Sequence, residues 1–176
     1  MHSPYAFKLI KDVVRPGIYG FYSYWKVEKY LDKKERSDYR FINSVRFTIR
    51  LVVFLQSKRI VSSETSRLGK IVALALELKW VVLPEKKDFL FEKTDLFLIN
   101  GNDKAPDEFT INHIKQAINA GSSIFAINPS SEIQRVLEAP MKYGLFLYDK
   151  NCLILIPRKE MAYVSYPVSL RLFKKH

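Results

Sequence analysis

The turn at residues 62–69, with the sequence SSETSRLG, is the segment whose residue types come closest to a ligand-binding loop. It lies between a short β-branched run and an apolar helical pattern, which is where nucleotide-binding loops occur. Such loops usually contain several glycines, because glycine lets the backbone approach a ligand closely. This turn has glycine only at Gly69. It is therefore either a working cofactor loop or the remnant of one.

Other catalytic chemistry has little support in the residue pattern. The sequence has no P-loop, no GxSxG nucleophile elbow and no HExxH zinc motif. Two of the three histidines are His2 and His176, and we expect the third, His113, to pack or to be partly exposed on a helix. Cys152 is the single cysteine of the sequence, so the chain cannot form an internal disulfide or a zinc site of several thiolates. It lies in the apolar run CLILI, which favours a small buried hydrophobic residue. We expect no catalytic histidine or cysteine and no metal.

The elements that position the turn follow from the spacing of apolar residues. The first third of the chain has helical spacing throughout. The predicted helices there cover residues 3–14, 22–33 and 38–56. Strand and helix patterns then alternate. The predicted strands are 59–62, 79–83, 95–100 and 123–128, and the predicted helices are 66–78, 105–120 and 130–138.

The last part of the chain predicts two strands within 143–157, joined by a turn at 149–151. Apolar and polar residues alternate over 163–173 well enough to predict another strand. Pro167 would place this strand at a sheet edge, because proline lacks an N–H. These patterns predict an α/β fold with an open, mainly parallel sheet. We expect residues 1–57 to form a helical segment packed on an α/β domain at 58–176, as one structural unit. Ligands of such sheets bind outside the carboxyl ends of the strands, which selects 62–69, 84–87 and 100–103.

The net charge of +11 over 176 residues is concentrated near the start of the chain. Residues 1–60 contain 13 Lys and Arg against 5 Asp and Glu. This excess indicates either the solvated faces of amphipathic helices or a surface for nucleic acid or another acidic partner. No apolar run approaches the ~20 residues that span a bilayer, and the first residues lack a basic-then-apolar leader. We therefore expect a soluble, cytoplasmic protein.

Several segments, taken in order, carry a family resemblance. They are HSPYAF at 2–7, the aromatic and acidic stretch around Tyr22, Tyr24 and Glu28, IRLVVFLQSKRIV at 49–61, DLFLINGN at 95–102 and FLYDKNCLILIPRKE at 146–160. The chain resembles class I S-adenosylmethionine-dependent methyltransferases, in particular a small bacterial group with an N-terminal HSPF-type helical segment. The resemblance implies a Rossmann-like methyltransferase sheet with a C-terminal antiparallel hairpin, preceded by N-terminal helices.

The resemblance also implies positions for a cofactor pocket. The family's cofactor loop begins with an acidic residue that precedes a series of glycines. Ser62 corresponds to the acidic position and Glu64 to the first glycine. Thr65, Ser66, Leu68 and Gly69 match the family's threonine, serine, leucine and glycine if Arg67 is an insertion. Glu85 matches the acid that takes the ribose hydroxyls, although its PEKKD segment could equally be a solvated turn. Asn100 ends the strand where similar enzymes have aspartate. The implied, vestigial cofactor-binding set is Ser62, Glu64, Thr65, Ser66, Gly69, Glu85 and Asn100.

Three departures from the family pattern weaken the implied chemistry. Glu64 would put a side chain where the backbone should approach S-adenosylmethionine. Asn100 cannot act as a general base and adds no charge to a divalent cation. Only nine residues separate Glu85 from Asp95. A parallel crossover needs roughly a dozen residues, so we expect the sheet to be truncated around the third strand.

Three functions remain open at this point. The first is a methyltransferase-like protein with a degenerate S-adenosylmethionine loop, non-catalytic and acting as a binding or interaction protein. The second is an active S-adenosylmethionine-dependent methyltransferase with an atypical loop. The third is a basic nucleic-acid-binding module that uses the N-terminal helices. A homo-oligomer is compatible with all three.

Overall fold

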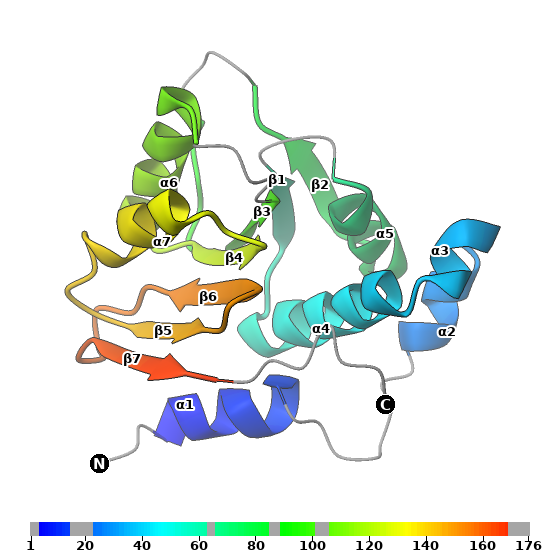
Figure 1. Ribbon diagram of the computed structural model, residues 1–176, viewed down its shortest axis with the longest axis horizontal. Helices are drawn as coiled ribbons and strands as arrows, with labels where there is room; N and C mark the ends of the chain where they lie inside the picture. The colour runs from blue at the N-terminus through cyan, green and yellow to red at the C-terminus, as the bar shows by residue number, and fades with distance from the viewer. Residues whose placement is uncertain (1–3, 15–22, 63–65, 85–88, 101–105, 169–176) are drawn as a thin grey trace.

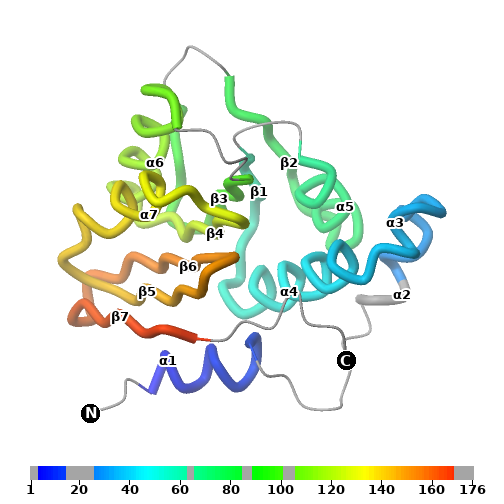
Figure 2. Tube along the Cα trace, viewed as in Figure 1, coloured from blue at the N-terminus to red at the C-terminus, as the bar shows by residue number. Residues whose placement is uncertain are grey.

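The computed structural model describes residues 4–14, 23–62, 66–84, 89–100 and 106–168 (Figures 1 and 2). A seven-stranded sheet crosses this part of the chain in the order β2-β1-β3-β4-β6-β5-β7. The strands are β1 Arg59–Ser62, β2 Lys79–Val82, β3 Asp95–Asn100, β4 Ser123–Ile127, β5 Leu145–Tyr148, β6 Cys152–Ile156 and β7 Val164–Pro167. Strand β6 runs antiparallel to β4 and β5, and the other neighbouring pairs are parallel. The predicted α/β fold with a mainly parallel sheet is confirmed.

Helices cover both faces of this sheet (Figure 1). Their bounds are α1 Pro4–Leu9, the π-helical η1 Ile10–Val14, α2 Ser23–Glu28, α3 Lys33–Ser37, α4 Tyr39–Leu55, α5 Arg67–Leu76, α6 Glu108–Ala120 and α7 Ser131–Glu138. One buried cluster joins α1, η1, α4 and α5 to the sheet, and a second joins α6 and α7 to its other face. In the part of the chain that is described, no helix is long and apolar enough to cross a membrane.

Strand β3 shows why the sheet is buried on both sides. Leu96 and Leu98 belong to the cluster under α4 and α5, whereas Phe97 and Ile99 belong to the cluster under α6 and α7. Successive side chains of a strand point to opposite faces, so a continuous apolar run fills both cores. The prediction of a buried parallel strand at 95–100 is confirmed.

The prediction of one helix across 22–33 is wrong. Helix α2 ends at Glu28, and a new helix, α3, begins at Lys33. The Asp32 carboxylate accepts a hydrogen bond from the Glu35 backbone N–H at 2.8 Å, and the Glu35 carboxylate accepts one from the Asp32 N–H at 2.9 Å. This capping box satisfies backbone donors at a helix start, so it favours a new helix over continuation of the previous one.

Strand β2 lies at one edge of the sheet, beside β1. The chain then passes to β3, on the other side of β1. Within the described parts of this connection, 83–84 and 89–94, there is no helix or strand. The opposite edge is β7, which pairs in parallel with β5 and ends at Pro167. The predicted edge position of the Pro167 strand is confirmed.

Candidate functional site

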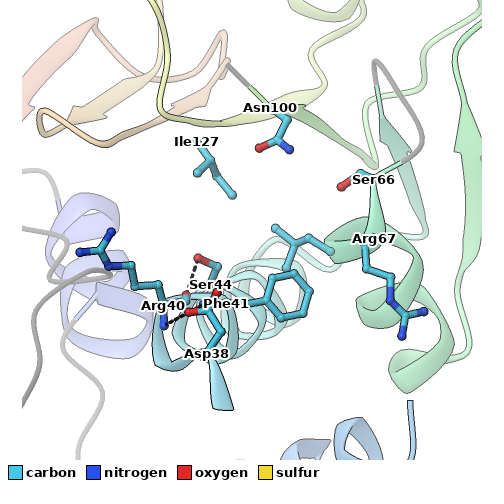
Figure 3. Close-up of a pocket in the computed structure, with 9 residues that line it drawn as sticks. Asp38, Arg40, Phe41, Ser44, Ser66, Arg67, Asn100 and Ile127 are labelled. Carbon is cyan, nitrogen blue, oxygen red and sulfur yellow. Dashed lines mark hydrogen bonds between the residues drawn. The ribbon is translucent and has the colours of Figure 1, made fainter. Parts of the chain in front are cut away.

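A cavity of about 350 Å³ opens at the carboxyl ends of β3 and β4, facing the amino-terminal ends of α4 and α5 (Figure 3). Its lining residues come from these four element ends. They are Asp38, Arg40, Phe41 and Ser44 from the start of α4, Ser66, Arg67 and Leu68 from the start of α5, Asn100 from β3 and Ile127 from β4. The cavity is at the small end of the ~300–1,000 Å³ range of small-molecule sites. It lies where an open α/β sheet is expected to bind ligands.

The wall formed by α4 uses its polar groups for its own helix. Asp38 is the N-cap, and one of its carboxylate oxygens accepts hydrogen bonds from the backbone N–H of Arg40 at 2.9 Å and of Phe41 at 3.2 Å. The Ser44 hydroxyl donates to the Arg40 carbonyl at 2.9 Å. These bonds satisfy backbone groups of the first turns, and they orient the Asp38 and Ser44 side chains along the helix (Figure 3).

The wall formed by α5 is tied to the N-terminal helices through Arg67. Its Nε and Nη2 donate to the two carboxylate oxygens of Glu35 at 2.7 and 3.0 Å, and Nη2 also donates to the Tyr30 carbonyl at 2.7 Å. The hydrogen bond from Arg67 is the main reason why the pKa of Glu35 lies below its usual value. The Arg67 side chain accordingly points away from the cavity (Figure 3). The residue that the family resemblance treats as an insertion thus joins α5 to α3 and to the turn that follows α2.

We expect this link to weaken in acid. The lowered pKa of Glu35 means that the Arg67 pair stabilises the fold above pH 4.5 and that this contribution is lost as the pH falls through the folded-state pKa. Arg67→Met should therefore cost about 0.5–1 kcal/mol at pH 7, as exposed ion pairs do, and less at pH 3, where protonation of Glu35 weakens the pair while the hydrogen bond to the Tyr30 carbonyl remains. Urea denaturation of both proteins at each pH measures this difference. Lys70→Met, at an exposed position of α5, is the control, and an equal loss at both pH values would contradict the assignment.

Ser62, at the position of the family's loop acid, lies behind the cavity rather than in its wall. Its side chain is fully buried, and its hydroxyl accepts a hydrogen bond from the indole N–H of Trp80 at 3.2 Å. The Trp80 ring also packs against the start of α5. A Cβ on Gly69 would lie 3.1 Å from Trp80 Nε1 and 3.3 Å from Leu98 Cδ1, so glycine permits close packing of this helix on the sheet.

The structure brings two of the implied cofactor residues together. Ser66 and Asn100 both line the cavity, and Asn100 is exposed at the end of β3. The Ser66 hydroxyl caps α5 by accepting from the Gly69 N–H at 3.2 Å. Ser62 and Gly69 lie behind this wall, as described above. The other three implied residues, Glu64, Thr65 and Glu85, lie outside the described residues.

The described walls can bind a polar ligand, but they offer little for catalysis. Asn100 can donate and accept hydrogen bonds, and it cannot take a proton at neutral pH. Cys152 is buried in β6. Burial is the main cause that raises the pKa of its thiol, the nearby Asp149 carboxylate is the second, and the thiol stays neutral. His113 is buried on α6, against the opposite face of the sheet. The described residues hold no group of three or more His, Cys, Asp or Glu that could bind a metal ion.

The contribution of α4 to the cavity is absent from the site residues proposed from sequence. The signal for it was present in the chain order. Helix α4 ends at Leu55 and β1 begins at Arg59, so the short connection makes the two elements run in opposite directions. The start of a helix that runs back along β1 must lie near the carboxyl end of the sheet, where Asp38 caps it.

Comparison with protein-family models, with curated proteins and with solved structures found no match to this chain. The case for a function therefore depends on the residues of the site.

Proposed function

We propose that this chain is a methyltransferase-like protein that has lost methyl transfer and acts by binding. Two features of the fold support the resemblance to methyltransferases. The mainly parallel sheet carries the antiparallel strand β6 next to β5 near the C-terminal end of the chain, as the family's terminal hairpin would. The described residues between β2 and β3 form no further strand, which agrees with a methyltransferase sheet shortened at its third strand.

The hydrogen bond between Ser62 and Trp80 is the observation that carries the loss of function. In the family the loop acid helps to hold the ammonium group of S-adenosylmethionine. Here the corresponding hydroxyl is buried and already accepts from the indole N–H at 3.2 Å. A cofactor in this cavity would find no carboxylate at that position. Asn100 removes a second function, because similar enzymes have an aspartate at the end of this strand that can bind a metal or act at the reaction centre. An amide at this position cannot act as a general base.

The binding partner that the charge favours is acidic. Lys33 and Lys34 on α3 and Arg40 on α4 are exposed, and the chain has a net charge of +11. Other N-terminal arginines have structural roles, because Arg36 donates to the Leu31 and Glu28 carbonyls and Arg50 donates to the Val13 carbonyl. Lysines therefore supply much of the open positive charge on these helices, which favours salt-dependent attraction to acidic partners over base-specific recognition.

Thermal denaturation with S-adenosylmethionine or S-adenosylhomocysteine tests the proposed loss of cofactor binding. A ligand at 100 times its Kd stabilises the folded state by about 2.7 kcal/mol. We expect no change in Tm at 1 mM of either compound. A rise of several degrees would show that the pocket still binds the cofactor, and methylation of any supplied acceptor would restore the enzyme hypothesis.

The loop hypothesis makes a separate prediction about Glu64. If the first experiment shows that the wild-type chain still binds the cofactor, Glu64→Gly should strengthen the binding of S-adenosylhomocysteine at least tenfold, because it removes a side chain where the backbone should approach the ligand. Isothermal titration of both proteins measures the change. Glu77→Gly, in the left-handed position after α5, is a control outside the cavity that removes the same charge. Unchanged or weaker binding by Glu64→Gly would show that the proposed alignment of the loop is wrong.

A further inference from the structure

A second cavity, of about 450 Å³, lies at the opposite end of the sheet from the first. Its walls come from the turn before β3, the end of α6 and the connections before β5 and after β6. The last two connections lie together at the left of Figure 1. Because β3, β4 and β5 all begin at this end, the cavity shares no lining residue with the site at the carboxyl ends.

Positive charge dominates the walls of this second cavity. Lys93, Lys142, Arg158 and Lys159 line it, against the single lining carboxylate of Glu160. Arg158 Nη1 pairs with Glu160 Oε1 at 3.3 Å, which leaves three exposed lysines to define the local charge. The three lysines come from three separate segments, so they surround the space rather than extend along one solvated helix face.

Hydrogen bonds hold the segments that carry these lysines. The Gly144 N–H donates to the Met161 carbonyl at 3.1 Å, and the Met161 N–H donates to the Arg158 carbonyl at 3.1 Å. On the other side of the cavity, the Ser122 hydroxyl donates to the Glu92 carbonyl at 2.7 Å. The backbone next to each lysine is thus fixed before a ligand binds, which lowers the entropic cost of binding.

The cavity also offers an aromatic surface. Tyr143 lines the cavity and is 53% exposed, so its ring is open to a ligand. Met141, which also lines the cavity, is partly buried. The Arg158 guanidinium is held by the Tyr5 hydroxyl at 3.0 Å and lies over the Tyr5 ring. Its Nε is buried and has no hydrogen-bond partner among the described residues.

Besides the Glu160 carboxylate, the end of α6 would oppose an anion, because helix C-termini carry partial negative charge. Two of its last carbonyls are already bonded. The Gly121 N–H donates to the Ile118 carbonyl at 3.0 Å, and the Ser122 N–H donates to the Ala117 carbonyl at 2.9 Å. The lysines therefore determine the sign of the charge that the cavity attracts.

We propose that this cavity binds a small organic anion that carries a phosphate group and a flat ring. Lysine ammonium groups bind phosphate as point charges, and the exposed Tyr143 ring can stack on a planar group. The volume is within the range of small-molecule sites. The proposal does not depend on the loss of methyl transfer, because the two cavities lie at opposite ends of the sheet.

Titration with adenosine 5′-monophosphate tests the proposal, with adenosine and inorganic phosphate as the two partial ligands. We expect the nucleotide to bind at least tenfold more tightly than either. Lys93→Glu/Lys142→Glu should weaken nucleotide binding at least tenfold. The control Lys70→Glu/Lys115→Glu makes the same charge change at exposed positions of α5 and α6 and should stay within twofold of wild type.

Three results would overturn the proposal. They are no nucleotide binding at millimolar concentration, an equal loss of binding in the two double variants, and inorganic phosphate binding as tightly as the nucleotide. Should the cavity variant fail to fold, Tyr143→Ala separates the outcomes. It should weaken the nucleotide without changing the affinity for phosphate, and unchanged nucleotide binding would contradict the role of the ring.

Discussion

Arg59→Met should lower the free energy of unfolding by about 3–5 kcal/mol, which is the usual cost of removing one partner from a buried ion pair. Arg59 Nε and Nη2 donate to the two carboxylate oxygens of Asp95 at 2.8 and 2.6 Å. The Asp95 side chain is fully buried and that of Arg59 is 16% exposed. Methionine would keep much of the side-chain volume and leave the Asp95 charge without its main partner.

Urea denaturation measures this loss, with two controls. Arg135→Met removes an exposed arginine of α7 and should change stability by less than about 0.5 kcal/mol. Arg59→Met/Asp95→Asn removes both charges and keeps an acceptor for the Glu92 N–H, which bonds Asp95 at 2.8 Å. This double variant should recover part of the stability. A loss below 1 kcal/mol in the single variant would show that Asp95 is not buried as described.

Gly144→Ala is the second change with a large expected effect, about 4 kcal/mol. Gly144 has φ +112°, a conformation in which an L side chain is strained by about 1–3 kcal/mol. A Cβ there would also overlap the Ile156 carbonyl oxygen and lie 2.8 Å from the Arg158 backbone nitrogen. These are backbone atoms of the neighbouring segment, so they cannot move aside as a flexible side chain can. Forced overlap of this kind adds about 1–3 kcal/mol.

Gly121→Ala is the matched control for Gly144. Gly121 also has a positive φ, +77°, but a Cβ there would meet only the flexible Lys93 side chain at 3.6 Å. We expect a loss of about 1 kcal/mol for Gly121→Ala, because strain acts there without overlap. Thermal or urea denaturation of both variants compares them. Equal losses at the two positions would mean that the β5 and β6 connections do not pack as closely as described.

Local patterns predicted most of the sheet. The runs RIVS, DLFLIN and SIFAI each form a strand at the expected residues, because β-branched and apolar residues with short links favour buried parallel strands. The turn between β5 and β6 was equally visible. Asp149 stabilises it by accepting from the Asn151 and Cys152 N–H groups. Local hydrogen bonding and alternation are sufficient for such elements.

The N-terminal helices show where periodicity fails. The spacing of apolar residues predicts one helix over 22–33. The structure instead begins a new helix after the Asp32–Glu35 capping box. This box depends on polar side chains, so apolar spacing cannot reveal it. The predicted helix over 38–56 agrees well with α4, which spans Tyr39–Leu55 between its caps Asp38 and Gln56. Its long apolar stripe gave a clear signal over many turns.

The cavity was only partly predictable. The carboxyl-end rule placed Ser66 and Asn100 at one site, and both line it. The direction of the Ser62 side chain could not be predicted, because it depends on Trp80, eighteen positions later in sequence, reaching across from β2. The link from Arg67 to Glu35 likewise joins elements 32 positions apart. Such contacts depend on the packing of helices against the sheet, which spacing within one segment does not specify.

Calorimetric titration of the wild-type chain with S-adenosylhomocysteine tests the central claim most directly. With the Ser62 hydroxyl buried against Trp80 and an amide at Asn100, we predict no heat of binding up to millimolar ligand. Binding with a micromolar Kd would contradict this account and show that the site remains a cofactor pocket.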